Sequence, residues 1–232
     1  MLKNIFYGME RLSLVDFEGH IATTLFTRGC NFCCPYCHNS ELALARPMEP
    51  ISFTDIMSYL RKREGIIDAV CISGGEPTIN PELKEALREL RALKLLIKLD
   101  TNGSNPEILR ELIDEGLIDY VAMDIKNGLS GYNRIIGKPH APINELIKSI
   151  NILRNSKIGY EFRTTLVKEF HSRADIEEIG ILLKGEERLY LQKFTDHGFC
   201  IENHLHEVDK KKALEYQDLL SKYIKNVYLR GY

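Results

Sequence analysis

The segment IATTLFTRGCNFCCPYCHN, residues 21–39, joins an apolar stretch to four cysteines that fall within eight positions. Its first part, residues 21–27, is rich in β-branched and apolar side chains and predicts a buried β-strand. The cysteines that follow directly after this strand are Cys30, Cys33, Cys34 and Cys37. Clustered cysteines of this kind form disulfides, bind zinc or iron, or act as redox thiols.

The rest of the chain alternates between segments of strand type and segments of helix type. Further strands are predicted at residues 67–73, 95–101, 118–125, 159–167, 188–194 and 226–231. Helices are predicted at residues 52–64, 80–93, 105–116, 141–156, 174–185 and 208–224. Ser52 is the expected cap of the first helix, and Asn80 and Asn105 each precede a proline as caps of theirs. Six strand–helix units therefore follow one another, with apolar strands typical of a parallel sheet covered on both faces.

Right-handed crossovers allow two arrangements of such units, an open doubly wound sheet or part of a (β/α) barrel. Periodicity does not distinguish them, but in both the working residues follow the carboxyl ends of the strands. Distinctive residues do follow four of the predicted strands: the cysteines, SGGEP at 73–77, DTNG at 100–103 and MDIKNG at 123–128. Packing does not require this pattern, so it favours a functional site at one rim of the sheet.

Composition limits the classes of function. The chain has 232 residues, enough to bury a substantial core as one domain over residues 1–232. A net charge of −2 and the lack of a basic tail give little support for binding duplex DNA. There is no run of eighteen apolar residues, and the start of the chain lacks the pattern of a signal peptide. We therefore expect a cytoplasmic protein without nucleic-acid or membrane partners, in a compartment where disulfides are rare.

Three explanations of the cysteine cluster differ in which cysteines they use. The pairs Cys30/Cys33 and Cys34/Cys37 abut, whereas structural zinc sites usually separate their pairs by a dozen or more residues. A redox pair would leave two cysteines unexplained. Without Cys33, the remaining three have the spacing C-x3-C-x2-C. Three thiolates on a four-iron cubane leave one iron open for a substrate or cofactor.

This spacing resembles the signature of the radical S-adenosylmethionine (SAM) superfamily. From about residue 13 to the end, the chain is similar in order to the glycyl-radical-enzyme activating proteins. Among these it most resembles the longer activating proteins of anaerobic ribonucleoside-triphosphate reductase. The segments that carry the resemblance are SLVDFEGHIATTLFTRGCNFCCPYCHN, ISGGEPT, DTNG, MDIK, FRTTLV, LQKF and NVYLRG. The chain departs from the family at two places. One is Cys33, where relatives often carry arginine or another residue, and the other is DFEGH (16–20), a segment in which a proline and a basic residue are expected.

The resemblance implies a fold, two cofactors and a reaction. The fold would be a partial (β/α)6 barrel with parallel strands and outer helices. The cofactors would be a 4Fe–4S cluster and SAM. This anaerobic oxidoreductase would pass an electron, from a donor such as flavodoxin or ferredoxin, to SAM and release a 5′-deoxyadenosyl radical. That radical would abstract hydrogen from a glycine of a partner enzyme, here an anaerobic ribonucleotide reductase.

The resemblance also implies roles for thirteen residues. The 4Fe–4S cluster would be held by Cys30, Cys34 and Cys37, with Cys33 a bystander that points away. SAM would be bound by Tyr36, His38, Gly74, Gly75, Glu76, Thr101, Asn102, Asp124, Lys126 and Arg163. No catalytic residue beyond the cluster and SAM is implied.

Within the SAM set, the implied roles match the chemistry of the side chains. Lys126 and Arg163 would face the SAM carboxylate, because a cationic pair is its natural complement. The glycines of GGEP (74–77) would let the backbone approach the SAM amino group, with Glu76 as an acceptor. The ribose would contact Thr101 and Asn102, and the backbone near Tyr36 and His38 would flank the adenine. Taken alone, Lys126 and Arg163 would be more simply explained as surface ion pairs.

Other functions remain open at this point. The chain could activate a pyruvate formate-lyase-type enzyme, or act on a small molecule as another kind of radical SAM enzyme. A non-enzymatic alternative is an iron–sulfur electron carrier or a zinc-structured module, but GGEP, DTNG and MDIK would have no role there. The segments 127–142 and 197–208 are expected to contact the partner. Cys71, inside a predicted strand, is expected to be a core residue.

Overall fold

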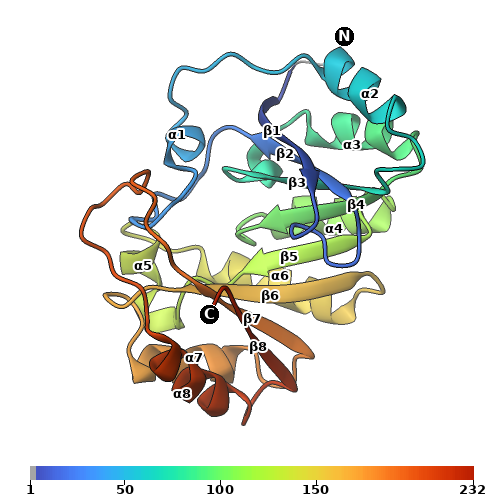
Figure 1. Ribbon diagram of the computed structural model, residues 1–232. Helices are drawn as coiled ribbons and strands as arrows, with labels where there is room; N and C mark the ends of the chain where they lie inside the picture. The colour runs from blue at the N-terminus through green and yellow to red at the C-terminus, as the bar shows by residue number, and fades with distance from the viewer. Residues whose placement is uncertain (1–3) are drawn as a thin grey trace.

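An eight-stranded sheet forms the centre of the protein in its computed structural model, which describes residues 4–232 (Figure 1). The first three residues of the predicted domain, 1–3, lie outside the described residues. The strands are β1 (Phe6–Ser13), β2 (Ala22–Thr27), β3 (Ala69–Gly74), β4 (Leu96–Thr101), β5 (Tyr120–Asp124), β6 (Gly159–Leu166), β7 (Arg188–Lys193) and β8 (Asn226–Arg230). The longer helices are α2 (Phe53–Arg61), α3 (Leu83–Arg91), α4 (Pro106–Asp114), α6 (Ile143–Asn155), α7 (Arg173–Leu182) and α8 (Lys210–Leu220). Shorter helical turns are α1 (Ser40–Ala43), η1 (Pro77–Ile79), η2 (Leu129–Gly131) and α5 (Tyr132–Ile135).

Strand order decides between the two arrangements that periodicity left open. The strands occur in the sheet in the order of the sequence, β1 to β8, and β2 to β8 are all parallel. A doubly wound sheet requires a reversal of strand order, which is absent from the described sheet. Right-handed crossovers in constant order place the helices on one face, so the opposite face becomes the inside of an open barrel. The predicted partial barrel is confirmed.

Two local predictions are wrong. Strand β1 was not predicted, because its sequence FYGMERLS mixes apolar and charged residues, and three of its eight residues are exposed where it pairs antiparallel with β2 at the sheet edge. Helix α3 begins at Leu83 with Glu82 as its N-cap, not at Asn80. The chain is still turning at Asn80, whose backbone N–H donates to the carbonyl of Pro77 over 3.0 Å. The predicted cap of α2 is confirmed, since the Ser52 side chain accepts a hydrogen bond from the backbone N–H of Asp55.

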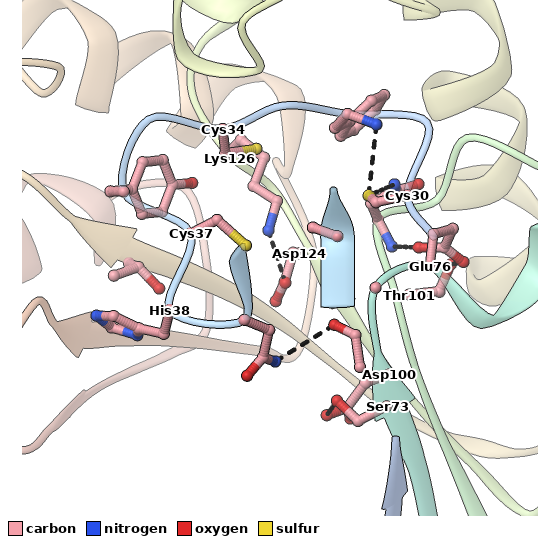
Figure 2. Close-up of a pocket in the computed structure, with 18 of the residues that line it drawn as sticks. Cys30, Cys34, Cys37, His38, Ser73, Glu76, Asp100, Thr101, Asp124 and Lys126 are labelled. Atoms are coloured by element: carbon pink, nitrogen blue, oxygen red, sulfur yellow. Dashed lines mark hydrogen bonds and ion pairs between the residues drawn. The ribbon is translucent and has the colours of Figure 1, made fainter. Parts of the chain in front are cut away.

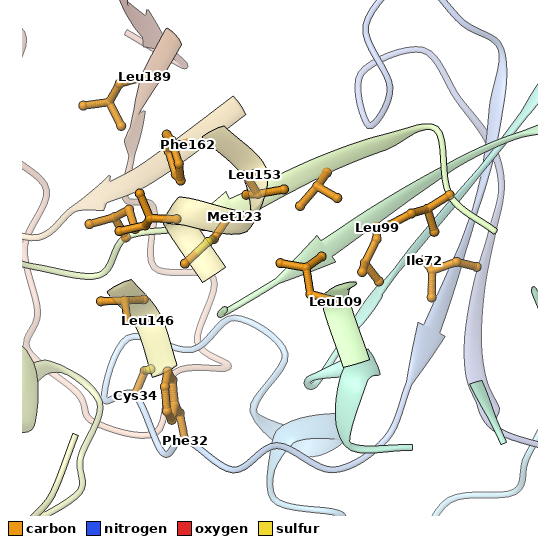
Figure 3. Packing of buried hydrophobic residues seen from close by; sticks show 14 of the residues in the cluster. Phe32, Cys34, Ile72, Leu99, Leu109, Met123, Leu146, Leu153, Phe162 and Leu189 are labelled. Atoms are coloured by element: carbon orange, nitrogen blue, oxygen red, sulfur yellow. The ribbon is translucent and has the colours of Figure 1, made fainter. Parts of the chain in front are cut away.

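The two faces of the sheet differ in polarity, contrary to the expectation of strands that are apolar on both sides. The outward face carries the core, in which strand residues pack against helix residues such as Leu109 and Leu153 (Figure 3). The fully buried strand residues in this layer include Ile72, Leu99, Met123, Phe162 and Leu189. Burial of each such side chain stabilises the fold by about 1.5–3 kcal/mol. The inward face is largely polar, which suits a binding site rather than a second core.

None of the helices within residues 4–232 combines the length and apolar character needed to span a bilayer.

Candidate active site at the carboxyl rim

A cavity of about 220 Å³ lies at the carboxyl ends of strands β3 to β7 (Figure 2). All thirteen residues predicted from the sequence line it, although they come from five separate segments of the chain. Cys33 is not among the lining residues. The residues that sequence reasoning did not assign to the site are Phe32, Asn39, Ala43, Ser73, Asp100, Thr165 and Gln192. Parallel strands bring their carboxyl ends to one rim, which explains why motifs far apart in sequence meet here.

The loop after β2 carries the cysteines, and hydrogen bonds to two other loops hold it in place. The backbone N–H of Cys33 donates to the carbonyl of Ile136 over 2.9 Å, and the Asn31 amide donates to the Ser104 hydroxyl over 2.7 Å. The backbone of Cys33 also packs against Gly137, where an added Cβ would lie 2.2 Å from the Cys33 carbonyl oxygen. Cys33 is therefore part of the anchorage of the loop.

The donor set of the cavity fits an iron–sulfur cubane better than a single ion. Within residues 4–232, no three His, Cys, Asp or Glu groups converge closely enough to hold one metal ion. Zinc needs convergent ligands, whereas a cubane offers a separate iron to each thiolate. Cysteines spread around a cavity wall therefore suit the cubane (Figure 2).

Burial keeps the cysteine thiols neutral until a metal binds them. It raises the pKa of Cys30 to about 12 and the pKa of Cys34 to about 11. Both groups are protonated at neutral pH on their own, so metal binding at these positions would release protons. The buried hydroxyl of Tyr36, which also lines the cavity, has no hydrogen-bond partner among the described residues.

A buried ionic network crosses the cavity from β4 to β6. Lys126 Nζ lies 2.8 Å from Asp124 Oδ2, and Arg163 Nε lies 2.9 Å from Asp124 Oδ1. Arg163 also contacts Asp100 at 3.2 Å, and the Ser73 hydroxyl donates to Asp100 over 3.1 Å. Burial alone would raise the pKa of Asp124, but the charges of Arg163 and Lys126 outweigh it and hold the pKa at about 2.

These ion pairs are not the surface pairs of the simpler explanation. The side chains of Lys126 and Arg163 are only 18% and 11% exposed. Asp124 is the counterion of both, so a ligand carboxylate would join existing pairs rather than meet free cations. The sequence does contain a signal for Asp100, the first residue of DTNG. It lies two positions after Lys98 on a predicted strand, so both charged side chains are expected on the same face of the sheet.

Glu76 joins the GGEP segment to the DTNG segment. The buried carboxylate accepts hydrogen bonds from the Thr78 and Thr101 hydroxyls at 2.6 and 2.7 Å, and from the backbone N–H of Asn102 at 2.7 Å. Asn102 in turn donates from its side chain to Asn31 in the cysteine loop over 2.9 Å. The polar groups of Thr101 and Asn102 are thus engaged within the protein. Any contact of these residues with a ribose would come in addition to these bonds.

The two glycines of GGEP allow the end of β3 to approach the β2 end closely. Gly74 has φ +112°, and an added Cβ would lie 2.4 Å from the backbone nitrogen and oxygen of Thr27. At Gly75, an added Cβ would lie 2.0 Å from the carbonyl oxygen of Gly29. The space for a ligand at this rim therefore depends on backbone contact between the two loops.

Gly75→Ala is expected to destabilise the folded protein by about 3 kcal/mol, because a clash with rigid backbone is not relieved by a rotamer change. Gly116→Ala is the control, since nothing lies within 4 Å of the added Cβ and only its φ of +64° is strained. That strain corresponds to about 1 kcal/mol. Denaturant unfolding followed by circular dichroism measures both values. Equal losses in the two variants would show that the β2 and β3 ends are not tightly packed.

A long connection after β7 covers the cysteine loop from outside. The ring of His38 stacks on Phe194 with centroids 5.4 Å apart, and burial lowers the pKa of His38, which favours its neutral form. The Ser40 hydroxyl donates to the carbonyl of Phe199, and the backbone N–H of Glu202 donates to the carbonyl of Pro35 over 3.0 Å. Such long-range contacts leave no local signal in the sequence.

Comparisons with known proteins agree with this geometry. Residues 24–182 match the family described as the Radical SAM superfamily. A protein of Methanocaldococcus jannaschii named as a glycyl-radical enzyme activating enzyme is 31% identical, over 99% of this chain and 97% of its own length. A pyruvate formate-lyase-activating enzyme of Staphylococcus aureus is 26% identical, over 66% of this chain and 66% of its own. The crystal structure of Streptococcus suis SuiB bound to S-adenosylmethionine has a TM-score of 0.67 at 17% identity, over 87% of this chain and 47% of that chain.

The structural likeness supports the fold, and the sequence matches support the family. Enzymes of this superfamily use a 4Fe–4S cluster and SAM, and the cavity has the thiols and the charged groups that such cofactors need. The superfamily match covers well over half of the chain, and the first relative matches almost its whole length. The chain therefore belongs to the radical SAM superfamily, and within it to the glycyl-radical-enzyme activating enzymes.

Proposed function

We propose that this protein cleaves SAM reductively and generates a glycyl radical on a partner enzyme, an anaerobic ribonucleotide reductase. The observation that carries the proposal is the meeting of three cysteines, the GGEP and DTNG segments and the Asp124 ion pairs on one cavity. The nearly full-length match to an activating enzyme supports the reaction class. The partner rests on resemblance over the whole chain, since the residues of the SAM site do not distinguish one glycyl-radical enzyme from another.

In this proposal Cys30, Cys34 and Cys37 hold the cluster, and Cys33 only anchors the loop. The cluster and SAM, when bound, supply the one-electron cleavage of a carbon–sulfur bond and the radical that abstracts hydrogen. Lys126 and Arg163, held in place by Asp124, balance the charge of the SAM carboxylate. Glu76 keeps the two loops around the SAM amino group in register. The connection after β7 limits access of water to the cysteines.

A thiolate-bound cluster needs a reducing compartment, so we place the protein in the cytoplasm, with a one-electron donor such as flavodoxin or ferredoxin. All six cysteines are free thiols, in keeping with that environment. The runner-up partner is a pyruvate formate-lyase-type enzyme, because an activating enzyme of that class matches two thirds of the chain.

The test is electron paramagnetic resonance on anaerobic mixtures of the reconstituted protein, SAM, a reductant and each candidate partner. A glycyl doublet on the reductase alone is the expected result, with 5′-deoxyadenosine as product. A doublet on the lyase alone would transfer the assignment to the runner-up. If neither enzyme gains a radical while a small metabolite accelerates SAM cleavage, the protein is a radical SAM enzyme of another kind.

A further inference from the structure

Two polar side chains that line the cavity, and that the sequence did not single out, make no hydrogen bond within the described residues. Of the lining residues that were not predicted, Ser73 and Asp100 belong to the ionic network, and Asn39 donates to the carbonyl of Gly74 over 3.3 Å. Thr165 and Gln192 are different, because neither side chain makes a hydrogen bond to any part of the chain that the structure describes. Both are partly exposed, so their polar groups are open to a ligand.

Thr165 and Gln192 lie next to one another near the open edge of the barrel. They are register partners on β6 and β7, and Gln192 is in turn the partner of Arg230 on β8. Strand β8 ends the sheet and pairs only with β7 among the described strands. The GGEP and DTNG segments follow β3 and β4, several strands away. The pair therefore forms the part of the cavity wall that a molecule entering from the open edge meets first.

The inner face continues from this wall into a second cavity of about 500 Å³. On each of three strands, one residue lines the second cavity and the residue two positions later lines the first. These pairs are Lys98 and Asp100, Glu161 and Arg163, and Tyr190 and Gln192. Two residues of a strand span about 7 Å, so the cavities lie one above the other. Val15 and Tyr228, which are 78% and 44% exposed, line the second cavity and extend this surface toward solvent. The second cavity therefore offers an extended polypeptide space on the side of Gln192 where Tyr190 lies.

We propose, on the basis of the function proposed above, that Thr165 and Gln192 bind the peptide backbone of the glycine-bearing segment of the partner. A glycine has no side chain, so only its backbone N–H and C=O groups can be recognised directly. A primary amide and a hydroxyl provide a neutral donor and acceptor that match these groups. The charged groups of the cavity are already paired with one another and are poorly suited to a neutral peptide group. Thr165 and Gln192 are thus positioning residues that set the distance of the glycine from SAM.

The test compares variants that remove or keep the polar groups at nearly constant shape. Gln192→Met and Thr165→Val remove them, Thr165→Ser restores the hydroxyl, and Thr54→Val changes an exposed threonine on α2 as a control. The partner is whichever purified enzyme, anaerobic ribonucleotide reductase or pyruvate formate-lyase, gains a glycyl radical with the wild-type protein. Initial rates of radical formation at several partner concentrations give kcat and KM, and equilibrium dialysis of labelled SAM gives its Kd.

We expect Gln192→Met and Thr165→Val each to lower kcat/KM for the partner about tenfold, the usual effect of one lost hydrogen bond that leaves its partner unpaired. Thr165→Ser should recover most of the rate, and Thr54→Val should match the wild type. Unchanged kcat/KM in both variants would overturn the inference while leaving the proposed function intact. A loss of SAM affinity as large as the loss of kcat/KM would also overturn it, because the two residues would then be SAM ligands. No radical on either enzyme with the wild-type protein would overturn the inference together with the proposed function.

Discussion

Cys34→Ala is expected to abolish assembly of the iron–sulfur cluster and, with it, all detectable cleavage of SAM, whereas Cys33→Ala retains both. Cys34 lines the cavity, and its thiol lies on the wall opposite GGEP together with Cys37 (Figure 2). Cys33 lies outside the lining, and its backbone contacts Ile136 and Gly137. Because each thiolate is expected to bind its own iron, loss of one ligand removes a bond that no neighbouring side chain replaces.

The measurement is anaerobic reconstitution with iron and sulfide, followed by iron analysis, visible absorbance and chromatography of 5′-deoxyadenosine. Cys71→Ala is the control for loss of a buried thiol, since Cys71 is fully buried in β3 and outside the cavity. It should assemble the cluster normally. Cluster loss in Cys33→Ala, together with survival in Cys34→Ala, would reverse the assignment of the two neighbouring cysteines.

Lys126→Met is expected to weaken SAM binding by about ten- to a hundredfold, while the absorbance of the cluster stays the same. Loss of a hydrogen bond to a charged group typically costs about 1.5–3 kcal/mol, which corresponds to that range of affinity. The substitution keeps the length of the side chain and leaves Asp124 paired with Arg163 at 2.9 Å, so the strand ends keep their contact. The effect of Arg163→Met on SAM binding would be harder to interpret, because both Asp100 and Asp124 would lose an ion-pair partner.

Equilibrium dialysis of SAM against the reconstituted protein measures the effect. Lys225→Met serves as the control, because its ammonium also forms a pair with a carboxylate, that of Glu187, but is 67% exposed. Exposed pairs contribute little, so this variant should match the wild type. If Lys126→Met binds SAM as tightly as Lys225→Met does, Lys126 serves only to neutralise Asp124.

Local sequence was sufficient for most of the elements and for the place of the site. Alternation of apolar segments predicted β2 to β8 and the six longer helices to within a few residues, but not the short helical turns α1, η1, η2 and α5. The thirteen candidate residues share one rim because all parallel strands of such a fold end on the same side. The two wrong predictions have different causes. Strand β1 is held by its pairing with β2, which its own sequence does not reveal, whereas the helix start at Asn80 is replaced by a local turn in which Asn80 donates to the carbonyl of Pro77.

The sequence by itself determined which residues belong to the candidate site, because the cysteine spacing and the segments after the strands are properties of short stretches of chain. Only the tertiary structure decided how these residues act on one another. Strand order selected the open barrel over the doubly wound sheet, since periodicity along a strand contains no information about its neighbours. Pairing of β5 with β6 placed Arg163 beside Asp124, which Lys126 already contacts from the same segment, and left Thr165 and Gln192 without hydrogen-bond partners among the described residues. Which side chains meet across a sheet depends on register and distance in space, and these arise only when the whole chain has packed.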